Sequence, residues 1–191
     1  MAKFPLKPTY NSPVILSFAL LACIIMGLDG LLAGHFTTKF FATYPGFRFK
    51  DPLFYFQIFS HTLGHRNWAH LTANFSVILL VGPILEEKYG SMNLIKMMLI
   101  TALVTGLMNS ALFSTGLLGA SGLAFLMILL ASFTNNKEGE IPLTFVLVLI
   151  LFLAKEVVQA FSSDDISQFA HIVGGLIGSL FGFIRGPKHA R

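Results

Sequence analysis

Several side chains that could act together in catalysis stand near the beginnings of long apolar segments. His70 and Asn74 are four residues apart, a spacing that places both on one face of a helix, and both can donate hydrogen bonds to an anion. Ser121 is flanked by Gly119 and Gly122, and such small neighbours expose its hydroxyl and let another backbone come close. Polar groups inside apolar segments are costly, so each of them is a candidate for function.

His171 is the second histidine of interest. Gly174, Gly178 and Gly182 follow it on the same helix face, and a stripe of small residues lets membrane helices pack with their backbones close. We therefore expect His171 to point at a neighbouring helix. Burial in a membrane favours the neutral imidazole, which is the form that can accept a proton.

These groups match what acyl transfer needs, namely a nucleophile, a base and donors to an oxyanion. Each one alone has a simpler interpretation. Ser121 and His171 could be helix-contact residues, Asn74 could hydrogen-bond between helices, and His70 could anchor a helix end at the membrane interface. The functional hypothesis therefore depends on whether the fold brings them together.

The composition is that of a membrane protein. Hydrophobic residues make up 54% of the chain and charged residues 12%, against about 25% in ordinary soluble domains. The mean hydropathy is +0.74. A single cysteine, Cys23, excludes an internal disulfide. The net charge of +4 comes from basic residues at the ends and in short loops, a pattern that sets membrane orientation and does not suggest nucleic-acid binding.

Six segments are apolar and close to the roughly 20 residues that a transmembrane helix needs. They are predicted at residues 13–34, 68–85, 93–113, 117–133, 141–161 and 166–184. The first is read as a retained span, because it has no clear small-residue cleavage site. The fold class is therefore an all-α membrane protein with six transmembrane helices, in a single domain (1–191) with short polar tails at 1–12 and 185–191.

Basic residues orient these spans. With a cytoplasmic N-terminus, eight of them lie inside and five outside, and six spans return the C-terminus to the cytoplasm. The inner set is Lys3, Lys7, Lys88, Lys96, Lys137, Arg185, Lys188 and Arg191, and the outer set is Lys39, Arg48, Lys50, Arg66 and Lys155. The aromatic-rich loop 35–67 is then outside, at the membrane interface. Spans 2, 4 and 6 all descend from outside, so His70, Ser121 and His171 are expected at one depth, roughly 10 Å or less below the surface.

The motifs resemble those of the rhomboid family of intramembrane serine proteases. The family has His-x-x-x-Asn, Gly-x-Ser-Gly and Ala-His-x-x-Gly-x-x-x-Gly on its second, fourth and sixth helices, and all three occur here in that order. A Gly-x-x-x-Glu-x-x-x-Gly motif after the second helix is also present. The matching residues are His70, Asn74, Gly119, Ser121, Gly122, Ala170, His171, Gly174, Gly178, Gly82, Glu86 and Gly90, with Ser60, His61 and His65 upstream.

The resemblance implies that Ser121 attacks the scissile carbonyl and that His171 is general base and then general acid, without an aspartate. The Ser121 N–H, His70 and Asn74 would hold the oxyanion, and Gly119 would shape the approach to them. Four further residues would have supporting roles: Phe125, Gly122, Gly174 and Gly178. No cofactor or metal is implied.

Two positions depart from the family pattern. The Trp-Arg of the first outer loop is replaced by Tyr55-Phe56-Gln57, so the anchoring of that loop is open. Phe125 stands where the family often has a tyrosine packed on the catalytic histidine, and it can keep the stacking but lacks the hydroxyl.

The resemblance implies an endopeptidase that cleaves transmembrane segments of other membrane proteins near the outer face of a bilayer. The minimal six-helix form suggests a bacterial inner membrane. One alternative is a catalytically silent rhomboid-like protein that binds membrane clients. Another is a channel or transporter, which would carry polar residues to the bilayer midplane. His61, His65 and His70 could suggest a metal site, but no carboxylate lies near them in a span. Nucleic acid is not expected as a partner.

Three charged positions have structural interpretations. We expect Glu86 to fix the turn between spans 2 and 3, and Asp29 to lie at a solvated end of span 1. Lys155 and its neighbour Glu156 are expected to extend from span 5 to the interface.

Overall fold

The computed structural model describes residues 7–32, 34–134, 140–160 and 165–184. Within these ranges the regular structure consists of eight helices and an isolated β-bridge between Thr43 and Leu117. The helices are α1 (Pro13–Leu31), α2 (Phe36–Phe40), α3 (Pro52–Ser60), α4 (Trp68–Tyr89), α5 (Ser91–Leu112), α6 (Ser121–Ala131), α7 (Leu143–Ala160) and α8 (Asp165–Ile184).

Each of the six predicted spans corresponds to a helix. In the described part of the chain α1, α4 and α5 are long and apolar enough to cross a membrane, and α6 and the 169–184 part of α8 are shorter apolar helices. The predicted loop 35–67 contains the short helices α2 and α3, which the sequence analysis did not anticipate. The prediction of an all-helical membrane fold is thus confirmed at this level.

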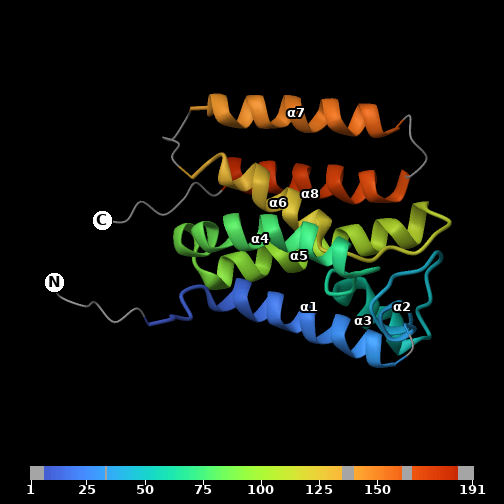
Figure 1. Ribbon diagram of the computed structural model, residues 1–191. Helices are drawn as coiled ribbons and strands as arrows, with labels where there is room; N and C mark the ends of the chain where they lie inside the picture. Colours follow the sequence, from blue (N-terminus) through green and yellow to red (C-terminus); the bar gives the residue numbers. More distant parts are fainter. Residues whose placement is uncertain (1–6, 33, 135–139, 161–164, 185–191) are drawn as a thin grey trace.

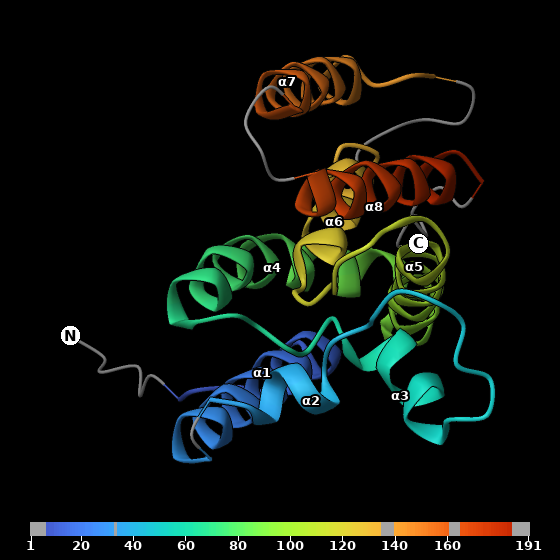
Figure 2. The same ribbon diagram turned by 90° about the vertical axis from the view of Figure 1, so that its right-hand side faces the viewer.

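Helix α6 lies at the centre of the bundle. It contacts α4, α5, α7 and α8, and most of its side chains are buried. Among the described helices, α7 contacts only α6 and α8, and it is the outermost element (Figures 1 and 2). The start of α1 and the end of α8 lie at one end of the bundle, and α2 and α3 lie at the other (Figure 1).

Apolar side chains fill the core and also cover the outside. Ile15, Ile78, Leu94 and Leu126 are fully buried in one cluster that joins α1, α4, α5 and α6. Large apolar side chains on the outer faces remain exposed, such as Leu20, Ile24, Leu80, Leu151 and Leu176. An exposed apolar surface of this extent is what a lipid environment requires.

Glu86, near the end of α4, joins three helices. Its carboxylate accepts hydrogen bonds from the Ser12 hydroxyl (2.6 Å), the backbone N–H groups of Val14 (3.0 Å) and Ile15 (3.2 Å), and the Ser91 hydroxyl (2.7 Å). The Ser91 contact is at the α4–α5 turn, where a role for Glu86 was expected. Through the other contacts, the carboxylate accepts hydrogen bonds at the N-terminus of α1. Free N–H groups there favour a negative charge.

The prediction for Asp29 was wrong. Asp29 is buried, not solvated, and its Oδ1 accepts a hydrogen bond from the Thr37 N–H at 2.7 Å. The carboxylate thus satisfies a free N–H at the start of α2. The side chains of Lys155 and Glu156, like the tail residues 1–6 and 185–191, lie outside the described residues.

Candidate active site

Ser121 is the first residue of α6. The predicted span began at 117, but residues 117–120 are not helical because Leu117 forms the bridge with Thr43 and Gly119 has a φ of 129°. Only glycine adopts such a φ readily. Ser121 was therefore predicted to lie inside the helix, but it is at the N-terminus, where backbone N–H groups have no intrahelical acceptor.

His70 and Asn74 lie beside this turn, on α4. A Cβ atom at Gly119 would lie 2.6 Å from His70 Cε1 and 3.7 Å from Asn74 Nδ2, so any side chain there would collide with His70. Asn74 is buried, and its Nδ2 has no hydrogen-bond partner among the described residues. A buried donor without an acceptor is rare, and here it belongs to a predicted oxyanion donor.

His171 lies on α8, where α8 passes closest to α6. A Cβ atom at Gly174 would lie 2.0 Å from the Gly122 carbonyl oxygen, and one at Gly178 would lie 2.4 Å from that of Leu126. The predicted glycine stripe therefore faces α6 and lets the two backbones touch. The His171 ring packs on the Phe125 ring, with centroids 4.3 Å apart. Phe125 thus has the stacking position expected from the resemblance.

One pocket brings these residues together. It has a volume of about 430 Å³ and lies among α4, α6, α7 and α8. Its lining comprises Asn74, Ser121, Phe125 and His171, together with the apolar Ala73, Val77, Ala124, Ile128, Val148 and Leu151. His70 contacts the site from the Gly119 side. The arrangement therefore places a hydroxyl, an imidazole and a free amide donor around one apolar cavity, as acyl transfer requires.

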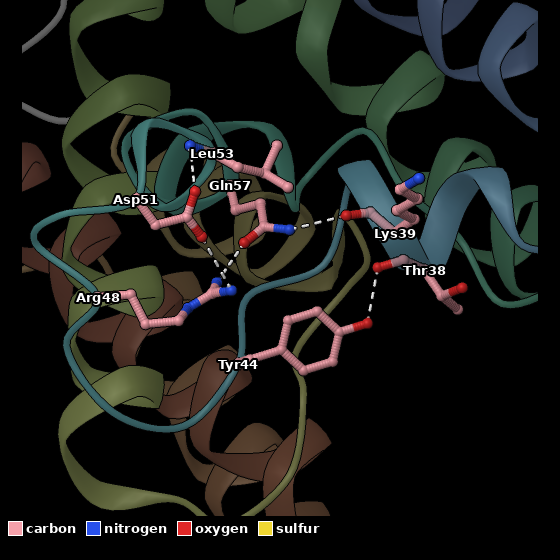
Figure 3. A network of polar contacts seen from close by, with 7 residues as sticks. All are labelled: Thr38, Lys39, Tyr44, Arg48, Asp51, Leu53 and Gln57. Carbon is pink, nitrogen blue, oxygen red and sulfur yellow. Dashed lines mark hydrogen bonds and ion pairs between the residues drawn. The ribbon is translucent and has the colours of Figure 1, made fainter.

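The loop at residues 35–67 is anchored by Arg48, which was not singled out from the sequence. Its guanidinium hydrogen-bonds to the Gln57 side-chain oxygen and pairs with Asp51 at 3.3 Å, and the Gln57 amide donates to the Lys39 carbonyl at 2.9 Å (Figure 3). Tyr44 also donates to the Thr38 carbonyl at 2.7 Å (Figure 3). An arginine is thus present in this loop, but outside the Tyr55-Phe56-Gln57 stretch.

His61 and His65 are both buried in the loop between α3 and α4. Burial lowers the pKa of His61 to about 4. Burial, with a smaller contribution from His70, lowers the pKa of His65 to about 4 as well. Both rings are therefore neutral near pH 7. Among the described residues, no group of three or more His, Cys, Asp or Glu side chains could hold a metal ion.

Comparison with known proteins agrees with the order of the motifs. The model of the family described as the Rhomboid domain matches residues 53–188, more than half of the chain. The chain is also similar to the rhomboid protease GlpG of Haemophilus influenzae, with 23% identity over 165 residues, which is 85% of each chain. The residues that line the pocket on α4, α6 and α8 all fall inside the matched region. The chain therefore belongs to the rhomboid family.

Proposed function

We propose that this chain is an intramembrane serine endopeptidase with Ser121 as nucleophile and His171 as general base. The observation that carries the proposal is the single apolar pocket that Ser121, Asn74 and His171 line together. Membership of the rhomboid family and the similarity to a protein named a rhomboid protease support the same reaction.

In this reaction the Ser121 hydroxyl attacks the scissile carbonyl while His171 takes its proton. His171 then returns the proton to the leaving amine, and a water molecule hydrolyses the acyl-enzyme with His171 again as base. The negative oxygen formed at each step is held by the Ser121 N–H, the Asn74 amide and His70. The free Nδ2 of Asn74 supports this assignment, because its acceptor would arrive with the substrate.

The lining of the pocket supports a substrate class. Apolar side chains of α4 and α7, including Val77 and Val148, form its walls, which suits an apolar segment of another membrane protein. A helix hides its carbonyl groups in intrahelical hydrogen bonds, so the cleaved segment must be extended. We therefore expect substrates with small or helix-breaking residues near the outer membrane face.

We also propose that the single domain crosses the membrane six times, with both ends cytoplasmic, in a bacterial inner membrane. The start of α1 and the end of α8 lie at the same end of the bundle, as an even number of crossings requires (Figure 1). Ser121 is at the N-terminus of α6, and this end of the helix is then near the outer face. The bacterial source of the GlpG relative supports the location.

The test is cleavage of a single-span reporter, with helix-destabilising residues at its outer end, by the protein in lipid vesicles. We expect the wild type to cut, Ser121→Ala and His171→Ala to be inactive, and EDTA to have no effect. Ser132→Ala is the matched control, because Ser132 lies at the other end of α6 and donates its hydroxyl hydrogen to the Leu129 carbonyl. This variant should cut like the wild type.

Labelling with a fluorophosphonate separates an unsuitable reporter from an inactive protein. A wild type that labels at Ser121 but does not cut would have the proposed nucleophile and need a different substrate. A wild type that neither labels nor cuts would behave as a silent client-binding protein, and the protease proposal would be wrong. If all variants cut the reporter equally, residues other than Ser121 and His171 would be responsible for the activity.

A further inference from the structure

Three of the four residues before Ser121 are held by the loop at residues 35–67. Leu117 and Thr43 exchange two backbone hydrogen bonds of 2.9 and 3.1 Å. The Gly119 N–H donates to the His61 carbonyl at 2.9 Å, and the Ala120 N–H donates to His65 Nε2 at 3.3 Å. Consecutive contacts from a loop more than 50 residues earlier in the chain thus define the path of the backbone into α6.

The last of these contacts differs from the others because a side chain makes it. Main-chain carbonyls at Thr43 and His61 are available whatever the residue type. The acceptor for Ala120, in contrast, is the ring nitrogen of His65, which is 1% exposed. A change of residue type at position 65 therefore removes the contact, so its effect can be tested by mutation.

The tautomer of His65 fits an acceptor role. Its Nδ1 lies 3.2 Å from the Leu63 carbonyl oxygen, which can only accept, so Nδ1 carries the hydrogen. Nε2 of the neutral ring then has a free lone pair for the Ala120 N–H. Burial keeps the pKa of His65 at about 4, so the ring stays neutral at neutral pH.

The same ring also touches the other side of the site. His65 packs edge-on against His70, with ring centroids 5.1 Å apart, and against Phe75 of α4 at 5.7 Å. His70 in turn lies against Gly119. One buried imidazole therefore contacts both the nucleophile turn and a residue proposed to hold the oxyanion.

We propose that His65 is a positioning residue that fixes Ser121 and His70 relative to each other. By accepting the Ala120 N–H, it fixes the Gly119–Ala120 peptide and, through it, the adjoining Ala120–Ser121 peptide, so that the Ser121 N–H, the first of the helix, faces the oxyanion position. This inference rests on the proposed function. Misplacement of a reacting group by about 1 Å can cost about 10²-fold in rate.

The experiment compares His65→Leu, His65→Gln and Gln57→Leu in vesicles, at a temperature where thermal melts show every variant folded. Leucine removes the acceptor, and glutamine offers an oxygen near the position of Nε2. Gln57→Leu is the matched control, because Gln57 is an equally buried polar residue of the outer loop whose hydrogen bonds go to Arg48 and Lys39. The readouts are kcat and KM for the reporter and the rate of fluorophosphonate labelling at Ser121.

We expect His65→Leu to lower kcat and the labelling rate by about 10²-fold with little change in KM. His65→Gln should restore most of both rates, and Gln57→Leu should lower the melting temperature while leaving kcat near the wild-type value. Equal rates for folded His65→Leu and wild type would overturn the inference alone. So would a loss of rate in Gln57→Leu as large as that in His65→Leu, since it would indicate a general effect of loop stability. A wild type that does not label would overturn the proposed function as well.

Discussion

Asn74 illustrates how a single atom can indicate chemistry. Its Nδ2 is buried and has no acceptor among the described residues, although leaving such a donor unpaired typically costs about 1–3 kcal/mol. The amide lies beside Gly119 and lines the same pocket as Ser121. A structural role would use the hydrogen bond within the fold, so the free donor favours a partner that is present only during the reaction.

We predict that Asn74→Ala lowers kcat by about 10²–10³-fold, the usual effect of removing one oxyanion donor. The melting temperature should stay close to the wild-type value, because Nδ2 makes no hydrogen bond in the described structure that could be lost. Reporter cleavage and thermal melts measure the two effects. Ser76→Ala is the control on the same helix, since Ser76 is exposed and bonds only to the Thr72 carbonyl among the described residues. Normal cleavage by Asn74→Ala would exclude the oxyanion role.

Among single residues, those predicted from the sequence are the ones whose spacing indicates a catalytic function. His70, Asn74, Ser121 and His171 stand in short motifs, and the pocket gathers three of them. Arg48 was missed because it lies in irregular chain before α3 while its partner Gln57 is nine residues away inside α3, and no periodicity relates the two. Such contacts depend on how the loop folds, and local sequence does not encode them.

The helices of the bundle are joined by polar contacts as well as by packing. Glu86 of α4 binds the first turn of α1 and the first residue of α5, so three helix ends depend on one carboxylate. The adjacent Glu87 is exposed. The two glutamates therefore form a natural comparison between a buried and a solvated carboxylate at the same end of one helix.

We predict that Glu86→Ala lowers the free energy of unfolding by at least about 1–3 kcal/mol, because it leaves buried donors at Ser12 and Ile15 without their acceptor. Glu87→Ala should change it by less than about 0.5 kcal/mol, as is usual for surface positions. Equilibrium unfolding in detergent micelles measures both. If Glu86→Ala and Glu87→Ala unfolded at the same denaturant concentration, the role given to Glu86 would be contradicted.

Helix boundaries could be predicted where the length of an apolar segment sets them. They were harder to predict elsewhere. Span 4 was predicted from residue 117 because Leu117 and Leu118 continue the apolar run, yet the helix begins at Ser121. The cause is tertiary: the outer loop pairs with Leu117 and keeps it extended. The helices α2 and α3 were missed because, at five and nine residues, they are too short to show a long apolar period.

For the molecule as a whole, the all-helical membrane fold followed from hydropathy, since a bilayer requires long apolar helices. The central position of α6 was not predicted, because the glycines at positions 174 and 178 indicated a close neighbour without identifying it. The stability of this assembly also has a pH dependence that composition does not reveal. It arises from two buried histidines, His61 and His65.

We predict that the protein loses stability as the pH falls from about 6.5 to about 4. The pKa values of His61 and His65 are lowered to about 4 by burial, whereas in the unfolded chain they return to about 6.5. Between these values the unfolded state binds more protons, so its free energy falls relative to the folded state. Full stability is therefore present above pH 6.5. Melting temperatures in micelles from pH 8 to pH 4 would measure the effect.

His61→Gln should flatten this dependence, because it removes one of the two titrating groups while glutamine can still hydrogen-bond to Thr105, the partner of His61 Nε2. A melting temperature that is constant between pH 7 and pH 4.5 in the wild type would show that the two rings do not titrate on unfolding. A steeper dependence in His61→Gln would contradict the assignment to His61.

The placement of the proposed dyad on α6 and α8 has a consequence for the synthesis of the protein. Chains are made from the N-terminus, so the loop that holds the Ser121 turn and the turn itself are complete while α8 is still inside the ribosome. A nascent chain at that stage has the proposed nucleophile but not the proposed base. Under the proposed mechanism, proteolytic activity begins only when the last helix packs against α6, which would protect other newly inserted proteins beside the growing chain.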